Sequence, residues 1–544
     1  MVTSLSHLKR IEIRDCKLIK EIILTEETKK KTSKILFPKL DSLSLDGLPK
    51  LSRFCSGHPI EFQSLKELDI ISCHALTSFV ACVQQFYSEA NNSSETQYLF
   101  NRMVEFPELE KLYLSKMNSL ENTWDTQLMP NSFSNLKALT IHYCRKLSMV
   151  FPPGKLPRFR RLERLSISYC TVLQKIFQFQ DLDAEDTYAA VKFNLRELEI
   201  LLNGKLKMIW NKNFPIGFTF QELESVEVVD CGALKSIFPT SIATGLPRLQ
   251  SLTVKSSPGG GVICGIEKIV AKSETAGSDP YFKFPQLKTL VLYGLLKLTC
   301  FYPDRHITEW PKLKSLELIQ CDNAIIFGSE IINPNQEEAH GGGIQDNILQ
   351  PLFMFEKVNR NLEELTLHHN DLMQILSSQP PANFFSKVKV LTLQSLRPES
   401  CSDLFGFLKT LYNLAKLLVK DGTLKELFAH EDAVYVKLRH LSIYELSYLK
   451  HIWNQDAISQ SVTQCLETLT IGSCNSLSKI VQSAASFRSL VALNVNDCRT
   501  LKSLLTVSTA KTMVNLTEMS LRNCPTMTEV VENNRDQTED EVVF

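Results

Sequence analysis

The feature that most constrains this chain is a spaced run of leucine and isoleucine residues that returns along its whole length. The copy from Leu65 to Phe79 reads Leu-x-x-Leu-x-Ile-x-x-Cys-x-x-Leu-x-x-Phe, and copies beginning at Leu136 and Leu466 keep this spacing. Its fourth and sixth positions alternate with polar residues, which is the two-residue period of a strand with one buried face. One copy is too short to bury its apolar side alone, so neighbouring copies must stack on a shared core.

Eighteen copies follow one another, and the steps between their first residues average about 30 residues, close to the range of leucine-rich repeats. The copies begin at Leu8, Leu40, Leu65, Leu109, Leu136, Leu162, Leu195, Leu223, Leu249, Leu287, Leu313, Leu362, Val388, Leu414, Leu438, Leu466, Leu490 and Leu516. An aromatic residue precedes this first position by three residues in eleven copies, so two independent columns fix the register.

The sequence therefore predicts an α/β fold, a single leucine-rich-repeat solenoid over residues 1–544. We expect a curved horseshoe of about 18 repeats, with a parallel β-sheet on the concave face and irregular or short helical segments on the convex side. Five long steps contain the polar and glycine-rich stretches that are typical of surface loops. These predicted loops are 24–36, 83–105, 178–192, 257–284 and 329–358.

Nine of the fifteen cysteines occupy the ninth position of a copy, where the chain turns inward after the strand. These structural repeat cysteines are Cys16, Cys73, Cys144, Cys170, Cys231, Cys321, Cys474, Cys498 and Cys524. Asn203, Asn370 and Ser257 take the position in other copies, and a small, weakly polar side chain suits a buried turn. The chain has no Cys-x-x-Cys motif, and stacked side chains point the same way, so we expect reduced, buried thiols.

The sequence motifs support no catalytic proposal. The glycine run Gly259–Gly261 is followed by neither the lysine of a phosphate-binding loop nor the third glycine of a dinucleotide-binding loop, which Cys264 replaces. H-E-x-x-H and G-x-S-x-G motifs are absent as well. We expect a protein that is not an enzyme, with no catalytic residues, no cofactor and no metal site.

The charge balance and the hydropathy pattern limit which classes of partner and which cellular compartments are expected. The 60 basic and 60 acidic residues cancel, which argues against nucleic acid as a partner. No apolar stretch reaches the length of a membrane span, and the first residues lack the apolar core of a signal peptide. We expect a cytoplasmic or nuclear protein. The approach to Phe544 matches that to Phe37, so we also expect a segment of a longer array or a truncated product.

The concave face is the predicted binding surface for a protein partner, because side chains that alternate with the buried leucines form a broad, shallow surface there. Tyrosine and arginine are enriched at the energetic centres of protein interfaces, although tyrosine is also simply a good strand former. The candidate partner-binding residues are Tyr113, His142, Tyr143, Arg164, Tyr169, Tyr293, His368, His369, Tyr444 and Arg522.

Two alternating forms of the repeat resemble a known family. One form is Phe-Pro-x-Leu-x-x-Leu-x-Leu, as at Phe37–Leu45 and Phe284–Leu292. The other is Leu-x-x-Leu-x-Ile-x-x-Cys-x-x-Leu-x-x-Ile-Phe, which Leu223–Phe238 follows with valines at the two strand positions. Over essentially the whole chain, they resemble the C-terminal repeat region of plant coiled-coil-type nucleotide-binding leucine-rich-repeat (NLR) disease-resistance proteins.

The resemblance implies the recognition module of a plant intracellular immune receptor that acts in the defence response. Such repeats sense a pathogen effector or a guarded host protein, and a nucleotide-binding domain in cis or in trans is a further implied partner. The sequence contains neither a coiled coil nor a nucleotide-binding domain, so nucleotide switching is not carried over to it.

Two other functions stay open at this point. A leucine-rich-repeat substrate receptor of a ubiquitin ligase, or another protein-binding scaffold, predicts an N-terminal F-box segment and Gly-Leu repeat endings. A secreted or membrane receptor ectodomain predicts a signal peptide, a membrane span and mostly asparagine at the ninth position.

Overall fold

The computed structural model describes most of the chain. The described residues are 7–23, 35–81, 97–152, 154–178, 191–211, 218–257, 264–272, 279–328, 350–358, 361–398, 401–428, 438–453, 460–481 and 485–532. The central parts of the five predicted loops lie outside these residues, and so does the predicted array end at Phe544.

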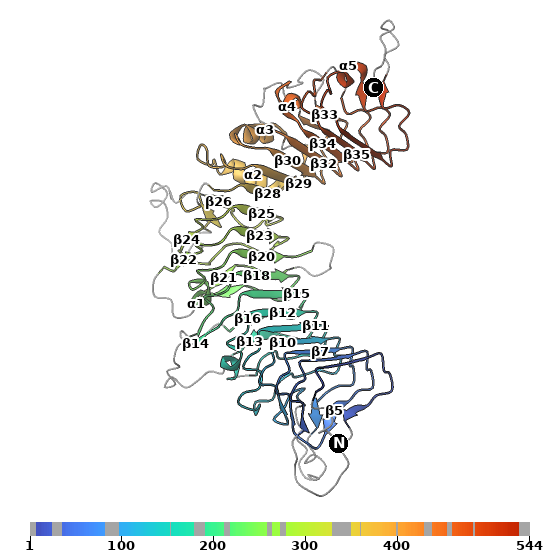
Figure 1. Ribbon diagram of the computed structural model, residues 1–544. Coiled ribbons are helices and arrows are strands. Elements are labelled where there is room, and N and C mark those ends of the chain that lie inside the picture. Colours follow the sequence, from blue (N-terminus) through green and yellow to red (C-terminus); the bar gives the residue numbers. More distant parts are fainter. Residues whose placement is uncertain are drawn as a thin grey trace. The chain divides into compact units, whose positions relative to one another are not determined.

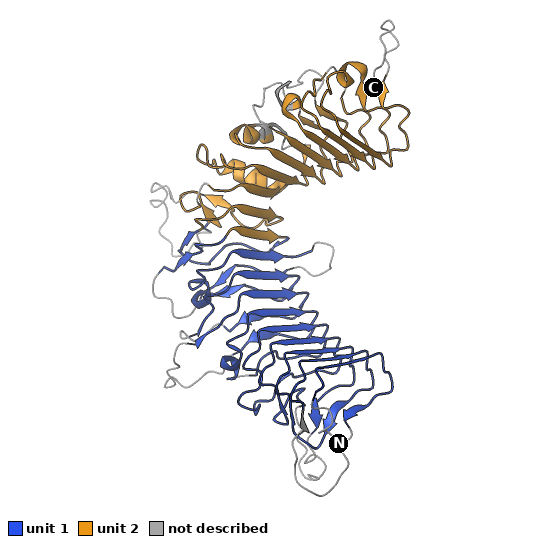
Figure 2. Cartoon of the chain, viewed as in Figure 1, with its two compact units in different colours: residues 1–287, 294–309, 345–350 blue, residues 288–293, 310–344, 351–544 orange. Residues whose placement is uncertain are grey.

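Eighteen five-residue strands, one from each repeat, run parallel to one another (Figure 1). They divide equally between two compact units, which Figure 2 shows in two colours. Unit 1 contains β1 (Arg10–Arg14), β4 (Ser42–Asp46), β7 (Glu67–Ile71), β10 (Lys111–Ser115), β11 (Ala138–His142), β12 (Arg164–Ser168), β15 (Glu197–Leu201), β18 (Ser225–Val229) and β20 (Ser251–Lys255). Unit 2 contains β23 (Thr289–Tyr293), β25 (Ser315–Ile319), β28 (Glu364–His368), β29 (Val390–Gln394), β30 (Lys416–Lys420), β32 (His440–Tyr444), β34 (Thr468–Gly472), β35 (Ala492–Asn496) and β37 (Glu518–Arg522).

The leucine spacing sets the register of these strands. Each strand begins two residues after the first residue of its repeat, so equivalent residues of neighbouring strands lie side by side, as Leu112, Leu139 and Leu165 do. The second and fourth residues of nearly every strand are buried, while the first, third and fifth face outward. This alternation confirms the predicted leucine-rich-repeat solenoid and its parallel sheet.

Segments outside the main sheet are short. The helices are η3 (Leu156–Phe159), α1 (Thr240–Ala243), α2 (His369–Ser377), α3 (Cys401–Thr410), α4 (Gln460–Cys465) and α5 (Val507–Ala510). The remaining strands are β2 (Glu21–Ile23), β3 (Ile35–Leu36), β5 (Arg53–Ser56), β6 (Ile60–Glu61), β8 (Val80–Ala81), β9 (Val104–Glu105), β13 (Lys175–Phe177), β14 (Val191–Lys192), β16 (Met208–Trp210), β17 (Phe218–Thr219), β19 (Phe238–Pro239), β21 (Val270–Ala271), β22 (Tyr281–Lys283), β24 (Ile307–Glu309), β26 (Phe327–Gly328), β27 (Phe353–Met354), β31 (Glu426–Phe428), β33 (His451–Trp453), β36 (Leu505–Thr506) and β38 (Val531–Glu532). They pair in parallel between repeats, an order that the sequence did not predict.

The aromatic column forms a stacked core behind the leucines. The rings of Phe37, Phe62 and Phe106 follow one another with centroids 5.1 Å apart at each step and nearly parallel planes. Phe62 and Phe106 are fully buried. Each of these three repeats therefore contributes one ring to a stack that binds it to its neighbours.

A left-handed residue follows the strand in sixteen of the eighteen repeats. It occupies the eighth position of the repeat, and its φ lies between 50° (Asn523) and 67° (Gly294). Its amide donates to the last strand residue of the next repeat in most cases, as Tyr143 N does to Ser168 O at 2.9 Å. The turn therefore adds one rung to the ladder and directs the ninth residue into the core.

The ninth position holds a side chain that bonds the main chain of the preceding repeat. The Cys73 thiol donates to Leu45 O at 3.7 Å. Asn203 makes the bond in two directions, because its Nδ2 donates to Ile167 O at 2.9 Å and its Oδ1 accepts from Cys170 N at 2.8 Å. The small polar side chain thus satisfies main-chain groups inside the core.

Seven of the nine repeat cysteines are buried, but Cys16 is exposed and Cys524 is half-buried. These two lie in the first and last described repeats, where no described repeat covers one side. None of the thirteen cysteines that the structure describes forms a disulfide.

Two predicted occupants of the ninth position are wrong. Ser257 is exposed, and Ser256 is buried in its place. In the repeat that begins at Leu362, helix α2 replaces the left-handed turn, so the fully buried side chain is Asp371 rather than Asn370.

Candidate functional site

The candidate surface is the outward side of the main sheet, made by the first, third and fifth residues of each strand and by the position-eight turn. We call it the sheet face. Five predicted residues come together on three neighbouring strands of unit 1 and the turns after two of them. Tyr113, His142 and Arg164 lie on β10, β11 and β12, and Tyr143 and Tyr169 follow β11 and β12. All five side chains are at least partly exposed.

Tyr143 and Tyr169 occupy position eight of adjacent repeats and stack on one another. Their ring centroids are 4.2 Å apart and their planes differ by 9°. Both residues have a φ of 56°, a conformation that costs a bulky residue on the order of 1–2 kcal/mol. A hydrogen bond to Tyr143 is the main cause that raises the pKa of Tyr169 above its ordinary value. The pair is therefore a fixed aromatic platform at the end of the strands.

A polar chain crosses the sheet face beside this platform. Tyr113 packs against the ring of His142 edge-on, with centroids 5.7 Å apart. His142 Nε2 lies 3.1 Å from Ser166 Oγ, and that hydroxyl donates to Glu199 Oε2 at 2.5 Å. Since the serine proton points at the carboxylate, the imidazole donates to Ser166 and accepts no proton from it. In a catalytic triad, the serine gives its proton to the histidine. Ser166 donates to Glu199 instead, so this chain of hydrogen bonds does not activate it as a nucleophile.

Burial sets the charge of His142. It lowers the pKa of the imidazole below its ordinary value, against the opposing influence of Glu199. The ring is therefore neutral at pH 7 and acts as a hydrogen-bonding and packing group. Arg164 is charged, but it forms an ion pair with Glu197 at 2.7 Å. An exposed pair of this kind contributes little to stability.

The candidates of unit 2 do not form a cluster. Tyr293, Tyr444 and Arg522 lie at the ends of β23, β32 and β37, which are not neighbours. The Tyr444 ring covers Gly472 on β34, where an added Cβ would lie 2.6 Å from the ring.

His368 and His369 differ from the prediction, since each is only 7% exposed. His368 ends β28 and His369 opens α2, so both lie where the helix takes the place of the left-handed turn.

Ser166 and Glu199 are the residues that the sequence analysis missed. Both are the third residue of their strand and so face outward beside the predicted cluster. Strand alternation places them on the same face as Tyr113, but serine and glutamate are common on exposed strand positions and so gave no distinguishing signal.

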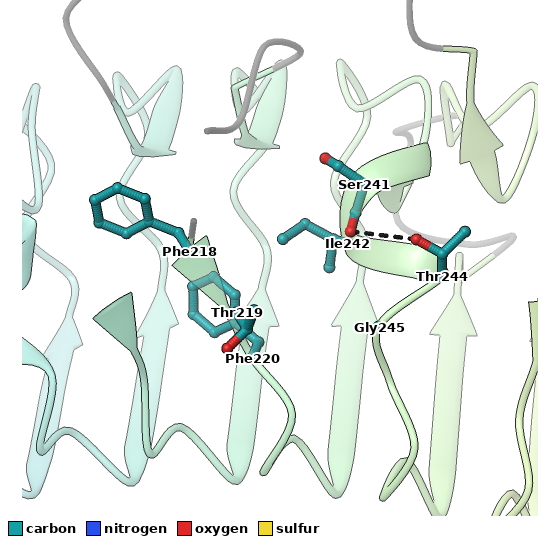
Figure 3. A pocket seen from close by; sticks show the side chains of 7 residues that line it. All are labelled: Phe218, Thr219, Phe220, Ser241, Ile242, Thr244 and Gly245. Atoms are coloured by element: carbon teal, nitrogen blue, oxygen red, sulfur yellow. Dashed lines mark hydrogen bonds between the residues drawn. The ribbon is translucent and has the colours of Figure 1, made fainter. Parts of the chain in front are cut away.

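Two cavities among the described residues contain none of the candidate residues. One of about 270 Å³ in unit 1 is lined by Phe218, Thr219, Phe220, Ser241, Ile242, Thr244 and Gly245 (Figure 3). It has no charged side chain, and Thr244 Oγ1 is already bonded to Thr240 O at 3.1 Å. A second cavity, of about 390 Å³ in unit 2, contains Asp421, which accepts from Ser395 Oγ at 3.0 Å.

Two negative findings concern the part of the chain that the structure describes. No group of three histidine, cysteine or acidic side chains is placed to hold a metal ion. No helix among the described residues has the length and apolar character needed to cross a membrane.

Comparisons with known proteins identify the repeats. Comparison with curated proteins gives no match. Among solved structures, the chain is similar to one in the crystal structure of a TLR13–ssRNA13 complex, at 14% identity and a TM-score of 0.35, covering 96% of this chain and 76% of that one. It is also similar to one in the crystal structure of PEPR1–AtPEP1, at 12% identity and a TM-score of 0.17, covering 90% and 88%.

The family profile of the leucine-rich repeats of RPS2-like plant disease resistance proteins matches residues 1–88, 108–258, 361–486 and 478–525. This match covers more than half of the chain, which therefore belongs to that leucine-rich-repeat family.

Proposed function

We propose that this chain is the protein-recognition module of a plant intracellular immune receptor and acts in the defence response. It binds a pathogen effector or a guarded host protein through the sheet face of unit 1, and it acts by binding rather than by catalysis. A nucleotide-binding domain, in cis or in trans, is a second partner in this proposal. The module acts in the cytoplasm or the nucleus.

The stacked pair of Tyr143 and Tyr169 carries the proposal. Two partly exposed aromatic rings are held in a costly backbone conformation, although a glycine or asparagine would adopt it with less strain. Among the described repeats, these are the only aromatic residues in a left-handed eighth position. Strained residues of this kind cluster at functional sites, and tyrosine is enriched among the residues that dominate binding energy.

Proximity labelling in plant cells, with the full chain as bait, tests the proposal. The double variant Y143N/Y169N removes both rings, while asparagine tolerates the left-handed turn. We expect it to lose a partner that the wild-type chain labels. The matched control is Y412N, because Tyr412 is 59% exposed but lies off the sheet face.

Two results would count against the proposal. An identical set of labelled proteins for wild type and Y143N/Y169N would exclude recognition by this pair. Labelling dominated by ubiquitin-ligase subunits would favour a substrate receptor instead.

A further inference from the structure

Four neighbouring repeats of unit 1 place apolar side chains next to one another on the outside of the protein. Tyr143, Tyr169 and Leu202 occupy successive left-handed turns, and Leu201 and Val229 lie opposite each other at the ends of β15 and β18. All five are partly exposed. We call them the apolar row. Exposed apolar side chains that lie together, rather than singly, mark sites of interaction.

Three carboxylates border the apolar row. Glu199 and Glu227 lie directly opposite each other on β15 and β18, and Asp230 occupies the turn that follows Leu202 in the stack. Like charges in directly opposite positions destabilise a sheet. Glu199 accepts from the neutral hydroxyl of Ser166, and no described cation forms an ion pair with Glu227. The chain thus keeps an electrostatic repulsion that a cationic partner would relieve.

The negative region has defined limits. Arg164 and Glu197 cancel each other in their ion pair, and the half-buried imidazole of His142 is neutral at pH 7. Lys116 lies in the turn before Tyr143, and Lys255 ends β20 beyond Val229. The uncompensated charge therefore lies on β15 and β18, with the tyrosine platform on one side.

We propose that this patch binds a positively charged, extended segment of a partner protein. Lysine or arginine side chains of the segment bind Glu199, Glu227 and Asp230, and an apolar side chain packs against Leu201 and Leu202. The inference rests on the proposed function only in taking a protein as the ligand.

The dimensions and chemistry of the patch fit this occupant. Three steps of about 4.8 Å separate the turns of Tyr143 and Asp230, roughly 14 Å, which four or five extended residues cross. A guanidinium group is also attracted to the faces of exposed tyrosine rings. Nucleic acids and anionic lipid surfaces carry the same charge sign as the patch and would be repelled.

Synthetic peptides test the charge preference directly. The probe is a fluorescent peptide, Gly-Ser-Arg-Leu-Arg-Leu-Arg-Ser-Gly, and its matched control replaces each arginine with glutamate. Fluorescence anisotropy with the full chain at low salt measures both affinities. We expect the arginine peptide to bind at least about tenfold more tightly, and its binding to weaken as salt is added.

Variants of the chain assign the binding to the patch. We expect E199Q/E227Q to weaken arginine-peptide binding by about tenfold, because the substitutions keep the side-chain shape and remove two charges. D230N is a second, independent variant, since its side-chain oxygen can still accept from Ser257 N, as Asp230 does at 2.7 Å. The matched control is E317Q, because Glu317 is the third residue of β25 in unit 2 and is also partly exposed.

Equal binding of the two peptides, or wild-type binding by both E199Q/E227Q and D230N, would overturn the inference. Its failure is distinguishable from failure of the proposed function. If peptide binding follows the charges but Y143N/Y169N labels the same proteins as wild type, the patch chemistry holds and the proposed function fails. If labelling depends on the tyrosines but peptide binding ignores the carboxylates, the proposed function holds and this inference fails.

Discussion

Asn203 accepts a hydrogen bond from the amide of Cys170 at 2.8 Å, in the buried turn where nine of the eighteen repeats place a cysteine. Its Nδ2 also donates to Ile167 O, so one side chain joins two repeats through a donor and an acceptor. A cysteine in this position bonds through a weak thiol donor, as Cys231 does to Ile200 O at 3.8 Å. The asparagine therefore makes the stronger version of a bond that recurs along the chain.

Replacement of Asn203 tests how much this bond contributes. We expect N203A to destabilise unit 1 by about 2–3 kcal/mol, because it leaves buried main-chain groups without partners. N203C should cost less, since it restores the side chain that other repeats use. Chemical unfolding followed by hydrogen exchange at Cys170 and its neighbours measures the change. Equal losses for the two variants would contradict this account.

Asp371 gives unit 2 a pH-dependent stability. Burial, reinforced by repulsion from Asp322, raises the pKa of Asp371 to about 7, and its Oδ1 has no hydrogen-bond partner among the described residues. The folded state therefore binds a proton that the unfolded state releases above pH 4. This contribution to stability is largest near pH 4 and is lost as the pH rises to 7, by up to about 4 kcal/mol.

The variant D371N isolates this effect. An asparagine stays neutral and offers both a donor and an acceptor, as the buried Asn203 does in its own repeat. We expect D371N to be more stable than wild type at pH 8 and about equally stable near pH 4. Thermal unfolding of the full chain, with hydrogen exchange along β28 and α2, measures both. The same pH dependence in wild type and D371N would contradict the prediction.

The repeat thiols should differ sharply in reactivity. Burial raises the pKa of Cys170 and Cys231 to about 12 each, so almost no thiolate forms at pH 8. Cys16 and Cys465 are exposed. We expect iodoacetamide to label the exposed pair in native protein and the buried pair only after unfolding, as read by mass spectrometry of peptides. Comparable labelling of all four would show that the buried turns open easily.

Lys116 tests the cost of the left-handed turn. Its side chain is exposed and its φ is 56°. We expect K116G to stabilise unit 1 by about 1 kcal/mol, because glycine adopts this conformation without the strain of a Cβ. K116A keeps the Cβ and should give no such gain, so it is the matched control in thermal unfolding. A gain of the same size in K116A would indicate that the charge, and not the backbone, is responsible.

The sequence predicted the strands because two columns, the first leucine and the preceding aromatic, act at a fixed distance. Leu136 and Phe133 alone place β11. The left-handed turn could not be predicted in the same way, because its occupants include residues as different as Tyr143 and Leu202. Helix α2 was missed for a related reason. The start of this helix depends on local main-chain geometry, which the residue types do not reveal. The same geometry buries His368, although histidine is polar.

The candidate site was predicted in part. Strand alternation placed Tyr113, His142 and Arg164 on one surface, since it depends only on register. The polar chain through Ser166 to Glu199 needed the distances between side chains of different repeats, which no single copy contains.

The turn after each strand has a consequence for how this surface can change over time. Its ladder bond is donated by the main chain, as Tyr169 N does to Leu201 O at 3.1 Å, and the side chain takes no part in it. Substitutions at this position therefore alter the surface while the main-chain hydrogen bond remains. Their cost in stability is limited to backbone strain. Each of the sixteen repeats with this turn thus offers a position where side chains can change without loss of the fold, and a lineage can vary what it recognises one repeat at a time.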